Sequence, residues 1–373
     1  MRIVILGASG NAGREVARLL SAGLGADDEL VLAGRDRARL AVTAAIASPP
    51  AKVLLEQVDL HDDAGVAGVV TGASQVVVTA AVPQRVGALA GIVLAAGADW
   101  IDTMLSTPAK LQALRDLEPR ITAAGRCFVT DAGFHPGLPA AMVRWAAQRL
   151  DTITEADVHA GLRVDWRAGT LADSTVDEML AEFGEFDLST WVDGGRRRLR
   201  WSECPTVDFG PPIGRKQCTP MPLAEMDSLP QEFPTLRRCG FYVSGFSPAM
   251  DYLALPVLML LARSPRLRPA AVRFARWSLQ ALARPSPPHR LALRLRATGT
   301  HHGRAATAAI DISGDDGYLI TAAPVVACLR RLRAGGAARP GLWLQANLLP
   351  PDELFDDLAG LDLTVARREP VPC

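Results

Sequence analysis

Residues 2–13 have the sequence RIVILGASGNAG, which opens the chain with a strand, a glycine-rich turn and the start of a helix. The run 2–6 has the length of a buried strand, and the glycines after it follow the pattern G-x-x-G-x-x-G. Glycines let the backbone turn sharply and approach a pyrophosphate, and a helix N-terminus offers N–H groups to phosphates. The turn predicts a dinucleotide site made of Gly7, Ala8, Ser9, Gly10, Asn11, Ala12 and Gly13. The alternative is a tight strand–helix turn that binds nothing.

Apolar runs of strand length alternate with helical patterns over the first 130 residues. The predicted strands are 2–6, 29–33, 53–58, 75–79, 100–102 and 126–130, and helical periodicity is present at 12–20 and 86–96. Such alternation is typical of parallel strands joined by helices. We therefore predict an α/β fold in which residues 1–130 form a Rossmann domain with a doubly wound parallel sheet.

The end of the second predicted strand distinguishes the two nicotinamide cofactors. A chain that binds NAD usually has Asp or Glu there, which holds the ribose 2′-hydroxyl. This chain has Ala33-Gly34-Arg35-Asp36 instead. A guanidinium at Arg35 can meet a 2′-phosphate and stack on the adenine, so the sequence predicts NADP, with Gly34 and Arg35 in the site. Alternatively, Arg35 is a solvated residue at a helix start; Asp36 can cap that helix in either case.

Two further loops fit the same domain. Asp59 follows the third predicted strand, where a carboxylate can contact the adenine amino group, although a helix-capping role is equally open. The fourth strand is followed by Ala80, Ala81, Val82 and Pro83. Small residues at that edge of the sheet let a nicotinamide ribose lie close to the backbone.

Composition argues against several classes of function. Lys+Arg and Asp+Glu are 40 each, so no net charge favours nucleic acid. The six cysteines form no C-x-x-C pair and have no histidine at ligand spacing, so no metal site and no disulfide framework is expected. The first apolar run is too short for a signal peptide, and no run of about 18 apolar residues predicts a membrane helix. We expect a cytoplasmic protein.

A second glycine motif follows the sixth predicted strand. Residues 130–138 have the sequence TDAGFHPGL, and Gly133, Pro136, Gly137 and Leu138 match a G-x-x-P-G-L signature. Together with the N-terminal turn and Ala33-Gly34-Arg35, this motif resembles the saccharopine dehydrogenase-like family of NAD(P)-dependent oxidoreductases. Residues 101–102, 169–170, 318–333 and 341–363 also resemble family segments, whereas Trp100 and Ser106 replace a tyrosine and a glutamate common there.

The resemblance implies a domain organisation. It covers nearly the whole chain in order, is specific over 1–145 and is loose from about 185 to 300. It implies an α+β substrate and dimerisation domain over 131–373, with a helix at about 321–335 that returns to the Rossmann domain, and it makes a homodimer plausible. The residues themselves predict strands at 153–162, 291–300 and 305–312, a helix at 173–183, and a hairpin over 191–201 around Asp-Gly-Gly.

Residues 252–284 form an unusual segment. Residues 252–262 are almost purely apolar, and 268–283 alternate arginines with large apolar side chains. One interpretation is a basic amphipathic helix at a membrane surface or at the mouth of a pocket for a lipid-like substrate. The favoured interpretation is a helical pair in the core or at a dimer interface, because arginine is the usual cation throughout this chain.

Two residues beside the second glycine motif are the catalytic candidates. His135 could supply a proton, since its ordinary pKa is about 6.5, and Asp131 could bind substrate. Capping and turn roles are open for both residues. His159, His301 and His302 are scattered, and nothing places Arg163 or Arg167, although either could bind a carboxylate. No Tyr-x-x-x-Lys occurs, which argues against a short-chain dehydrogenase.

The sequence therefore predicts an NADP(H)-dependent oxidoreductase. The family resemblance implies hydride transfer to a C=N or C=C bond of a small metabolite. The alternative is a non-catalytic NADP-binding sensor or a membrane-associated scaffold, with membrane contact through 252–284.

Overall fold

The computed structural model describes residues 1–47, 52–105, 107–164, 176, 180, 188–247, 249–262, 264–283, 285, 287–335 and 338–372. The predicted helix 173–183, the Gly-Thr turn at 169–170, Ser106 and Arg167 lie wholly or largely outside these residues. The chain divides into two compact units. Unit 1 consists of Met1–Ala141 and Tyr318–Asp362, and unit 2 consists of Met142–Gly317 and Leu363–Cys373.

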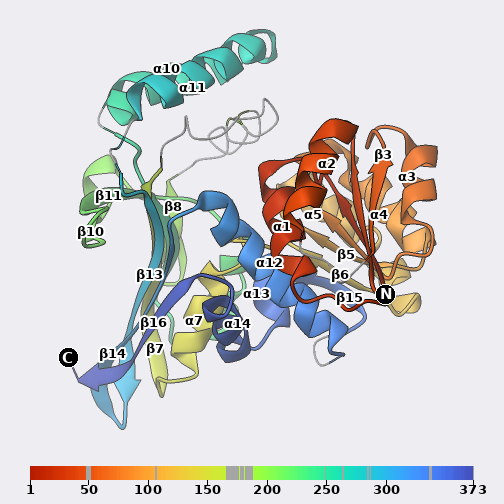
Figure 1. Cartoon of the computed structure of the whole chain (residues 1–373). Coiled ribbons are helices and arrows are strands. Elements are labelled where there is room, and N and C mark those ends of the chain that lie inside the picture. Colours follow the sequence, from red (N-terminus) through yellow and green to blue (C-terminus); the bar gives the residue numbers. More distant parts are fainter. Residues whose placement is uncertain are drawn as a thin grey trace. The chain divides into compact units, whose positions relative to one another are not determined.

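Unit 1 is built on a seven-stranded sheet whose order is β15-β6-β5-β4-β1-β2-β3 (Figure 1). All of its strand pairs are parallel. The strands are β1 Arg2–Leu6, β2 Glu29–Gly34, β3 Lys52–Gln57, β4 Gln75–Val78, β5 Asp99–Asp102, β6 Cys127–Thr130 and β15 Gly341–Leu344. The predicted Rossmann sheet is thus confirmed. The prediction missed β15, which joins β6 from far along the chain.

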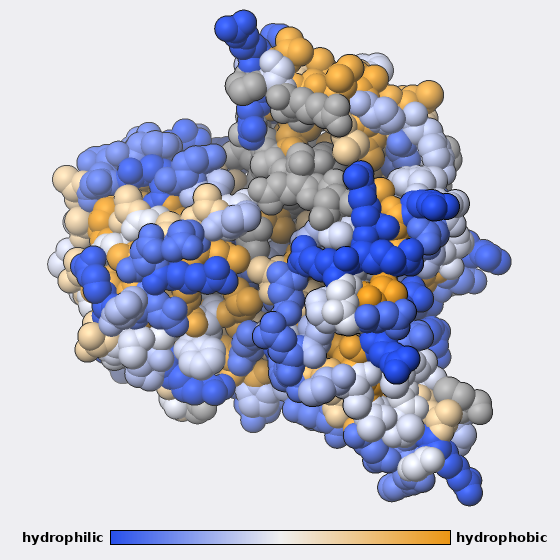
Figure 2. Space-filling model, turned by 180° about the vertical axis from the view of Figure 1, so that it is seen from behind, coloured by the Kyte–Doolittle hydropathy of each residue, from blue (hydrophilic) through white to orange (hydrophobic). Residues whose placement is uncertain are grey.

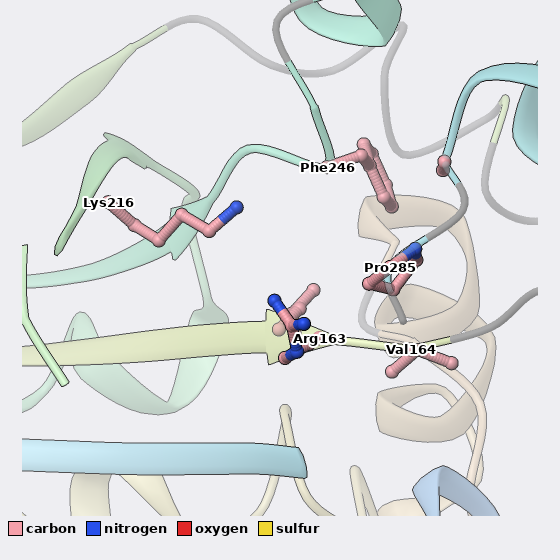
Figure 3. A pocket seen from close by; sticks show the side chains of 7 residues that line it. Arg163, Val164, Lys216, Phe246 and Pro285 are labelled. Carbon is pink, nitrogen blue, oxygen red and sulfur yellow. The ribbon is translucent and has the colours of Figure 1, made fainter. Parts of the chain in front are cut away.

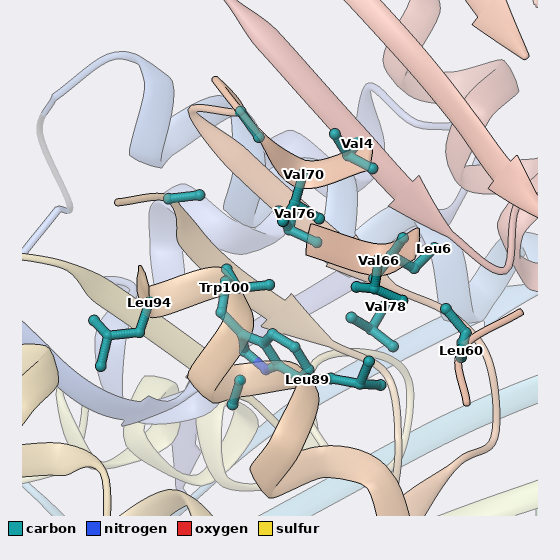
Figure 4. Packing of buried hydrophobic residues seen from close by; sticks show 14 of the residues in the cluster. Val4, Leu6, Leu60, Val66, Val70, Val76, Val78, Leu89, Leu94 and Trp100 are labelled. Atoms are coloured by element: carbon teal, nitrogen blue, oxygen red, sulfur yellow. The ribbon is translucent and has the colours of Figure 1, made fainter. Parts of the chain in front are cut away.

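Buried aliphatic residues hold the unit 1 sheet against its helices. Val4, Val76 and Val78 are fully buried on one face and pack with helix residues such as Val66 and Leu89 (Figure 4). Because both faces of a parallel sheet are covered, its strands are nearly continuous runs of Val, Ile and Leu. That property made the strands recognisable from the sequence.

The helices of unit 1 follow the strands in alternation. They are α1 Asn11–Ser21, α2 Arg37–Ile46, α3 Asp63–Val70, α4 Val86–Ala95, α5 Pro108–Arg115, α6 Glu118–Ala123, α12 Gly317–Arg333, α13 Gln345–Leu348 and α14 Pro351–Ala359, with α7 Pro139–Ala147 crossing into unit 2. The Arg333 guanidinium donates to Asp28 at 2.7 Å, and Arg330 donates to the Leu19 carbonyl at 3.3 Å. Helix α12 is therefore tied to the α1–β2 connection.

Unit 2 is built on a mixed sheet with the path β10-β11-β12-β7-β13-β14-β16, from which the hairpin β8–β9 branches at β12. The strands are β7 Thr152–Arg163, β8 Ser189–Val192, β9 Gly195–Arg198, β10 Thr206–Asp208, β11 Arg215–Pro220, β12 Arg238–Ser244, β13 Arg290–His301, β14 Arg304–Gly314 and β16 Thr364–Pro372. Only β12 and β7 pair in parallel along this path. The predicted α+β layer is confirmed.

The predicted hairpin around Asp-Gly-Gly is also confirmed. Val192 pairs with Gly195, and the two residues between them, Asp193 and Gly194, both have positive φ, at 50° and 87°. Two-residue turns of this kind match the twist of the strands, and Asp-Gly tolerates them. Strands β10, β11, β12 and β16 were not predicted.

The segment 252–284 forms a helical pair. A helical turn Met250–Ala254 leads into α10 Leu255–Ala262, and α11 Arg268–Leu282 follows. Met250, Ala254 and Leu258 are buried against Ala271, Ala275 and Leu279 in a small apolar core. The helical pair of the favoured interpretation is therefore present and has an apolar core. Helix α10 also has apolar residues that are exposed outside this core.

A charged pair lies on the unit 2 sheet. Asp157 of β7 is almost buried, and the Arg238 guanidinium of β12 contacts it at 2.5 Å. Burial raises the pKa of Asp157 from 3.8 to about 6, although Arg238 opposes that shift. Between pH 3.8 and about 6, the Asp157 carboxyl group is therefore protonated in the folded state and ionised in the unfolded chain.

We expect this proton to make the free energy of unfolding fall as pH rises from about 4 to 6. At about 1.4 kcal/mol per pKa unit the loss is about 3 kcal/mol. The Asp157→Asn variant should lack this loss. The difference in unfolding free energy between wild type and variant should therefore change by about 3 kcal/mol between about pH 4 and pH 6. Urea unfolding at several pH values measures it. Asp311→Asn, which removes a second Arg–Asp pair but keeps Asp157, is the control and should lose stability over this pH range as wild type does.

Candidate functional site

The glycine turn between β1 and α1 is a close crossing of backbone. A Cβ on Gly7 would lie 2.8 Å from the Ala80 nitrogen, and one on Gly13 would lie 2.7 Å from Thr79 Oγ1 and closer still to the Gly7 carbonyl oxygen. Gly7 also has φ +93°, which disfavours any side chain. These glycines bring α1 against β1 and the loop after β4, a cradle of closely packed backbone in which a Cβ would collide.

The N-terminus of α1 begins in this cradle. Its N-cap is Gly10, no side chain caps it, and the first turn has no acidic residue. The N–H groups and the positive end of the helix dipole are therefore not neutralised by a local carboxylate. This arrangement suits a phosphate.

The end of β2 presents arginines beside the turn. Arg35 and Arg39 are exposed, and Arg39 donates to the Ser9 carbonyl at 3.0 Å. A Cβ on Gly34 would lie 3.1 Å from Ser9 Oγ. Asp36 accepts from the Arg39 backbone N–H at 3.1 Å and caps α2, as predicted. Sequence reasoning missed Arg39, whose signal was the repeated arginine in Arg35-Asp36-Arg37-Ala38-Arg39.

The two other predicted loops lie at the same edge of the sheet, since all parallel strands end there. The exposed Asp59 accepts from the His61 backbone N–H at 3.0 Å; this bond, more than the nearby His61 and Arg35 charges, lowers the pKa of Asp59. Ala80, Ala81, Val82 and Pro83 are half-buried. The Val82 N–H donates to the Ala80 carbonyl at 3.0 Å, so the loop is a compact turn beside Gly7.

The second glycine motif forms a tight loop after β6. Gly133 has φ +150° and Gly137 has φ +128°. A Cβ on Gly137 would lie 2.7 Å from the Gly133 nitrogen and 2.9 Å from Gln345 Nε2. The buried amide of Gln345 has no hydrogen bond within the described residues. The motif thus closes on itself and against the end of β15.

A buried cation links the carboxyl ends of β5 and β6. Lys110 Nζ donates to Asp102 at 2.9 Å and to Asp131 at 2.8 Å, and it also contacts the Met104 carbonyl. All three charged side chains are fully buried. Burial disfavours the ammonium, but the two carboxylates outweigh it and raise the pKa of Lys110. Sequence reasoning missed Lys110, although it is one of only three lysines in the chain.

The two catalytic candidates are both desolvated. Burial raises the pKa of Asp131 against the attraction of Lys110. Burial also lowers the pKa of His135 to about 4, so its imidazole is neutral near pH 7. The roles of both residues stay predictions. In unit 2, His159 stacks on Tyr242 with ring centroids 5.0 Å apart, and His301 and His302 sit at the β13–β14 turn.

Unit 2 holds a small pocket lined by two cations. Arg163 and Lys216 line it together with apolar residues that include Phe246 and Pro285 (Figure 3). Its cavity volume is about 30 Å³, which is room for about one water molecule. The structure thus places Arg163, whereas Lys216 had not been singled out.

No group of three or more His, Cys, Asp or Glu side chains among the described residues could hold a metal ion. Within the same part of the chain, no helix is both long and apolar enough to cross a bilayer.

Comparison with known proteins bears on this geometry. Residues 3–129 match the family model of the saccharopine dehydrogenase NADP binding domain. Among solved structures, apo saccharopine dehydrogenase (L-Glu forming) from Saccharomyces cerevisiae is similar at a TM-score of 0.72 and 14% identity, covering 98% of this chain and 99% of that one. A DAP dehydrogenase from C. glutamicum in complex with DAP is similar at a TM-score of 0.49 and 16% identity, covering 96% and 98%. A search of curated proteins finds no match.

The matched domain and the fold together define the class of this protein, an NADP-dependent oxidoreductase. The predicted resemblance to the saccharopine dehydrogenase-like family is confirmed over residues 3–129, which match its NADP binding domain and contain the first glycine motif. NADP is the cofactor of the matched domain, and this confirms the prediction made from Arg35.

We expect the buried Lys110 cluster to be essential for stability. Lys110→Met leaves two buried carboxylates without their cation, which costs about 3–5 kcal/mol. Urea unfolding at pH 7 measures the loss. Lys52→Met, which removes an exposed pair with Glu29, is the matched control and should cost less than about 1 kcal/mol. Equal losses of unfolding free energy in the two variants would show that the buried cluster contributes no more to stability than an exposed ion pair does.

Proposed function

We propose that this protein transfers hydride between NADP(H) and a C=N or C=C bond of a small metabolite. The observation that carries the proposal is the glycine turn, in which Gly7 and Gly13 let α1 pack directly on β1 and the loop after β4, with the uncapped N-terminus of α1 at the edge of the sheet. The matched NADP-binding domain supports the cofactor. The fold shared with a saccharopine dehydrogenase over almost the whole chain supports C=N chemistry in particular.

The proposed cofactor site uses the residues at the carboxyl edge of the unit 1 sheet. The pyrophosphate would lie on the turn Gly7–Gly13 at the N-terminus of α1. Arg35 would meet the 2′-phosphate, and Arg39 is close enough to Ser9 to assist it. Asp59 would face the adenine, and the nicotinamide ribose would lie along the loop formed by Ala80, Ala81, Val82 and Pro83.

NADPH supplies the hydride when bound, so the protein has to orient the substrate and manage a proton. His135 and Asp131 are our candidates beside the glycine motif. With a pKa of about 4, His135 would act as a neutral hydrogen-bond donor rather than as an imidazolium acid. Asp131 would act through Lys110, its buried partner at 2.8 Å.

A paired titration tests the cofactor site. We expect wild type to bind NADPH at least tenfold more tightly than NADH, because a charge-assisted contact to a phosphate contributes roughly 1.5–3 kcal/mol. Arg35→Ala should lose most of that preference, because its affinity for NADPH should fall much more than its affinity for NADH. Intrinsic fluorescence measures both affinities.

Arg115→Ala, which removes an exposed arginine of α5, is the control and should keep the wild-type preference. An Arg35→Ala variant that still prefers NADPH tenfold would remove Arg35 from the site. Failure of wild type to bind either nucleotide at micromolar concentration would overturn the cofactor site itself.

The substrate class is tested by NADPH oxidation with sets of imines, enones and enoyl compounds. We expect turnover in one set, followed as the loss of absorbance of the reduced nicotinamide. Tight NADPH binding without turnover in any set would favour the non-catalytic sensor, which the desolvated His135 and Asp131 keep open.

A further inference from the structure

The helical pair α10–α11 exposes a concentration of apolar side chains. Of the eleven large hydrophobic residues that are exposed in the described part of the chain, seven lie between 252 and 277. They are Tyr252, Leu253, Val257, Met259, Leu260, Leu267 and Trp277, with Leu253 at 69% and Leu260 at 65%. Figure 2 shows hydrophobic residues gathered over this pair at the top of the view. Such patches mark interaction surfaces.

The exposed apolar residues of the helical turn Met250–Ala254 and of α10 lie away from the buried stripe that these two elements share. Met250, Ala254 and Leu258 recur every four residues and pack on α11. Leu253, Val257 and Leu260 fall on the other side of the helix, where a soluble helix normally has charged residues. The pair therefore has two apolar faces, and its own core covers only one of them.

The charged residues within the sequence of the helical pair, 252–284, are of one sign. Residues 252–284 contain six arginines, no lysine and no acidic residue, in a chain whose total charge is balanced. Arg266 and Arg273 are exposed. The carboxylate of the preceding Asp251 accepts a hydrogen bond from the Phe246 backbone N–H at 2.9 Å.

Aromatic side chains accompany the same surface. Trp277 is 56% exposed, and Tyr252 meets Trp201 edge to face with ring centroids 5.9 Å apart. Tryptophan and tyrosine are favoured where an apolar phase meets water. The combination of apolar, aromatic and basic residues matches helices that lie in the membrane interface.

We propose that the outer face of α10–α11 docks on an anionic membrane surface. The apolar side chains of α10 and Trp277 enter the acyl boundary, and the arginines meet lipid phosphates. Helices of 8 and 15 residues are too short to span a bilayer, so the contact is a surface one. A second copy of the chain fits less well, because a two-fold contact would bring the same arginines together. The inference does not depend on the NADP site.

Sedimentation with phosphatidylcholine vesicles, with and without phosphatidylglycerol, tests the proposal. We expect full-length wild type to bind the anionic vesicles and to lose affinity as salt rises. Leu253→Gln/Leu260→Gln should lose at least tenfold in affinity. Arg266→Gln/Arg273→Gln should also lose tenfold or more, since each arginine near an anionic leaflet contributes about fivefold.

Matched controls separate this surface from general stickiness and from misfolding. Val42→Gln/Val371→Gln and Arg115→Gln/Arg120→Gln change exposed residues elsewhere and should bind as wild type does. All variants should keep the wild-type circular dichroism and NADPH affinity. Absence of wild-type binding, or undiminished binding by the Leu253/Leu260 variant, would overturn the proposal. A wild-type dimer that this variant converts to monomer would overturn it too, in favour of a subunit interface.

Discussion

The N-terminal unit depends on the absence of two side chains. Helix α1 can reach β1 and the loop after β4 because Gly7 and Gly13 have no Cβ, and any side chain there would meet backbone. The same approach sets the N-terminus of α1 at the carboxyl edge of the sheet, where the strand ends converge. The fold and the proposed cofactor site therefore depend on the same two glycines, and a substitution at either position would disturb both.

The same edge also carries the least solvated charges of the unit. Asp102 and Asp131 end neighbouring strands, and one lysine neutralises both from a helix that follows. A buried ionic cluster of this kind contributes less stability than apolar packing would. Separating its three side chains would leave buried charges without partners, so their positions are tightly fixed. The cluster holds the loop that contains the second glycine motif at a defined distance from β5. Electrostatics thus supports a loop whose backbone conformation is already unusual at Gly133 and Gly137.

Most of unit 1 could be predicted because its signals are local. A buried parallel strand is an apolar run, and a glycine turn between strand and helix has a readable spacing. Strand β15 could not be predicted, since Gly-Leu-Trp-Leu is short and its partner β6 is distant in the sequence. Lys110 escaped notice for a related reason. Its two partners are 8 and 21 residues away, and only the sheet brings them to one nitrogen. In unit 2, β10, β11 and β12 lack a clear alternation of apolar and polar residues. They also do not alternate regularly with helices, which would have indicated where each strand begins and ends.

The position of β15 has a consequence for how the chain reaches its fold. Residues 131–340 lie between β6 and the strand that covers its open side. While the chain is being made, β6 therefore presents an unpaired parallel edge with Cys127 and Phe128 until most of the protein has been synthesised. Along the sequence, the main segment of unit 2 lies between the two segments of unit 1. The chain returns to unit 2 as β16 after the second segment of unit 1. The two units exchange chain three times, at 141, 317 and 362, so neither can be released as an intact piece by a single cut.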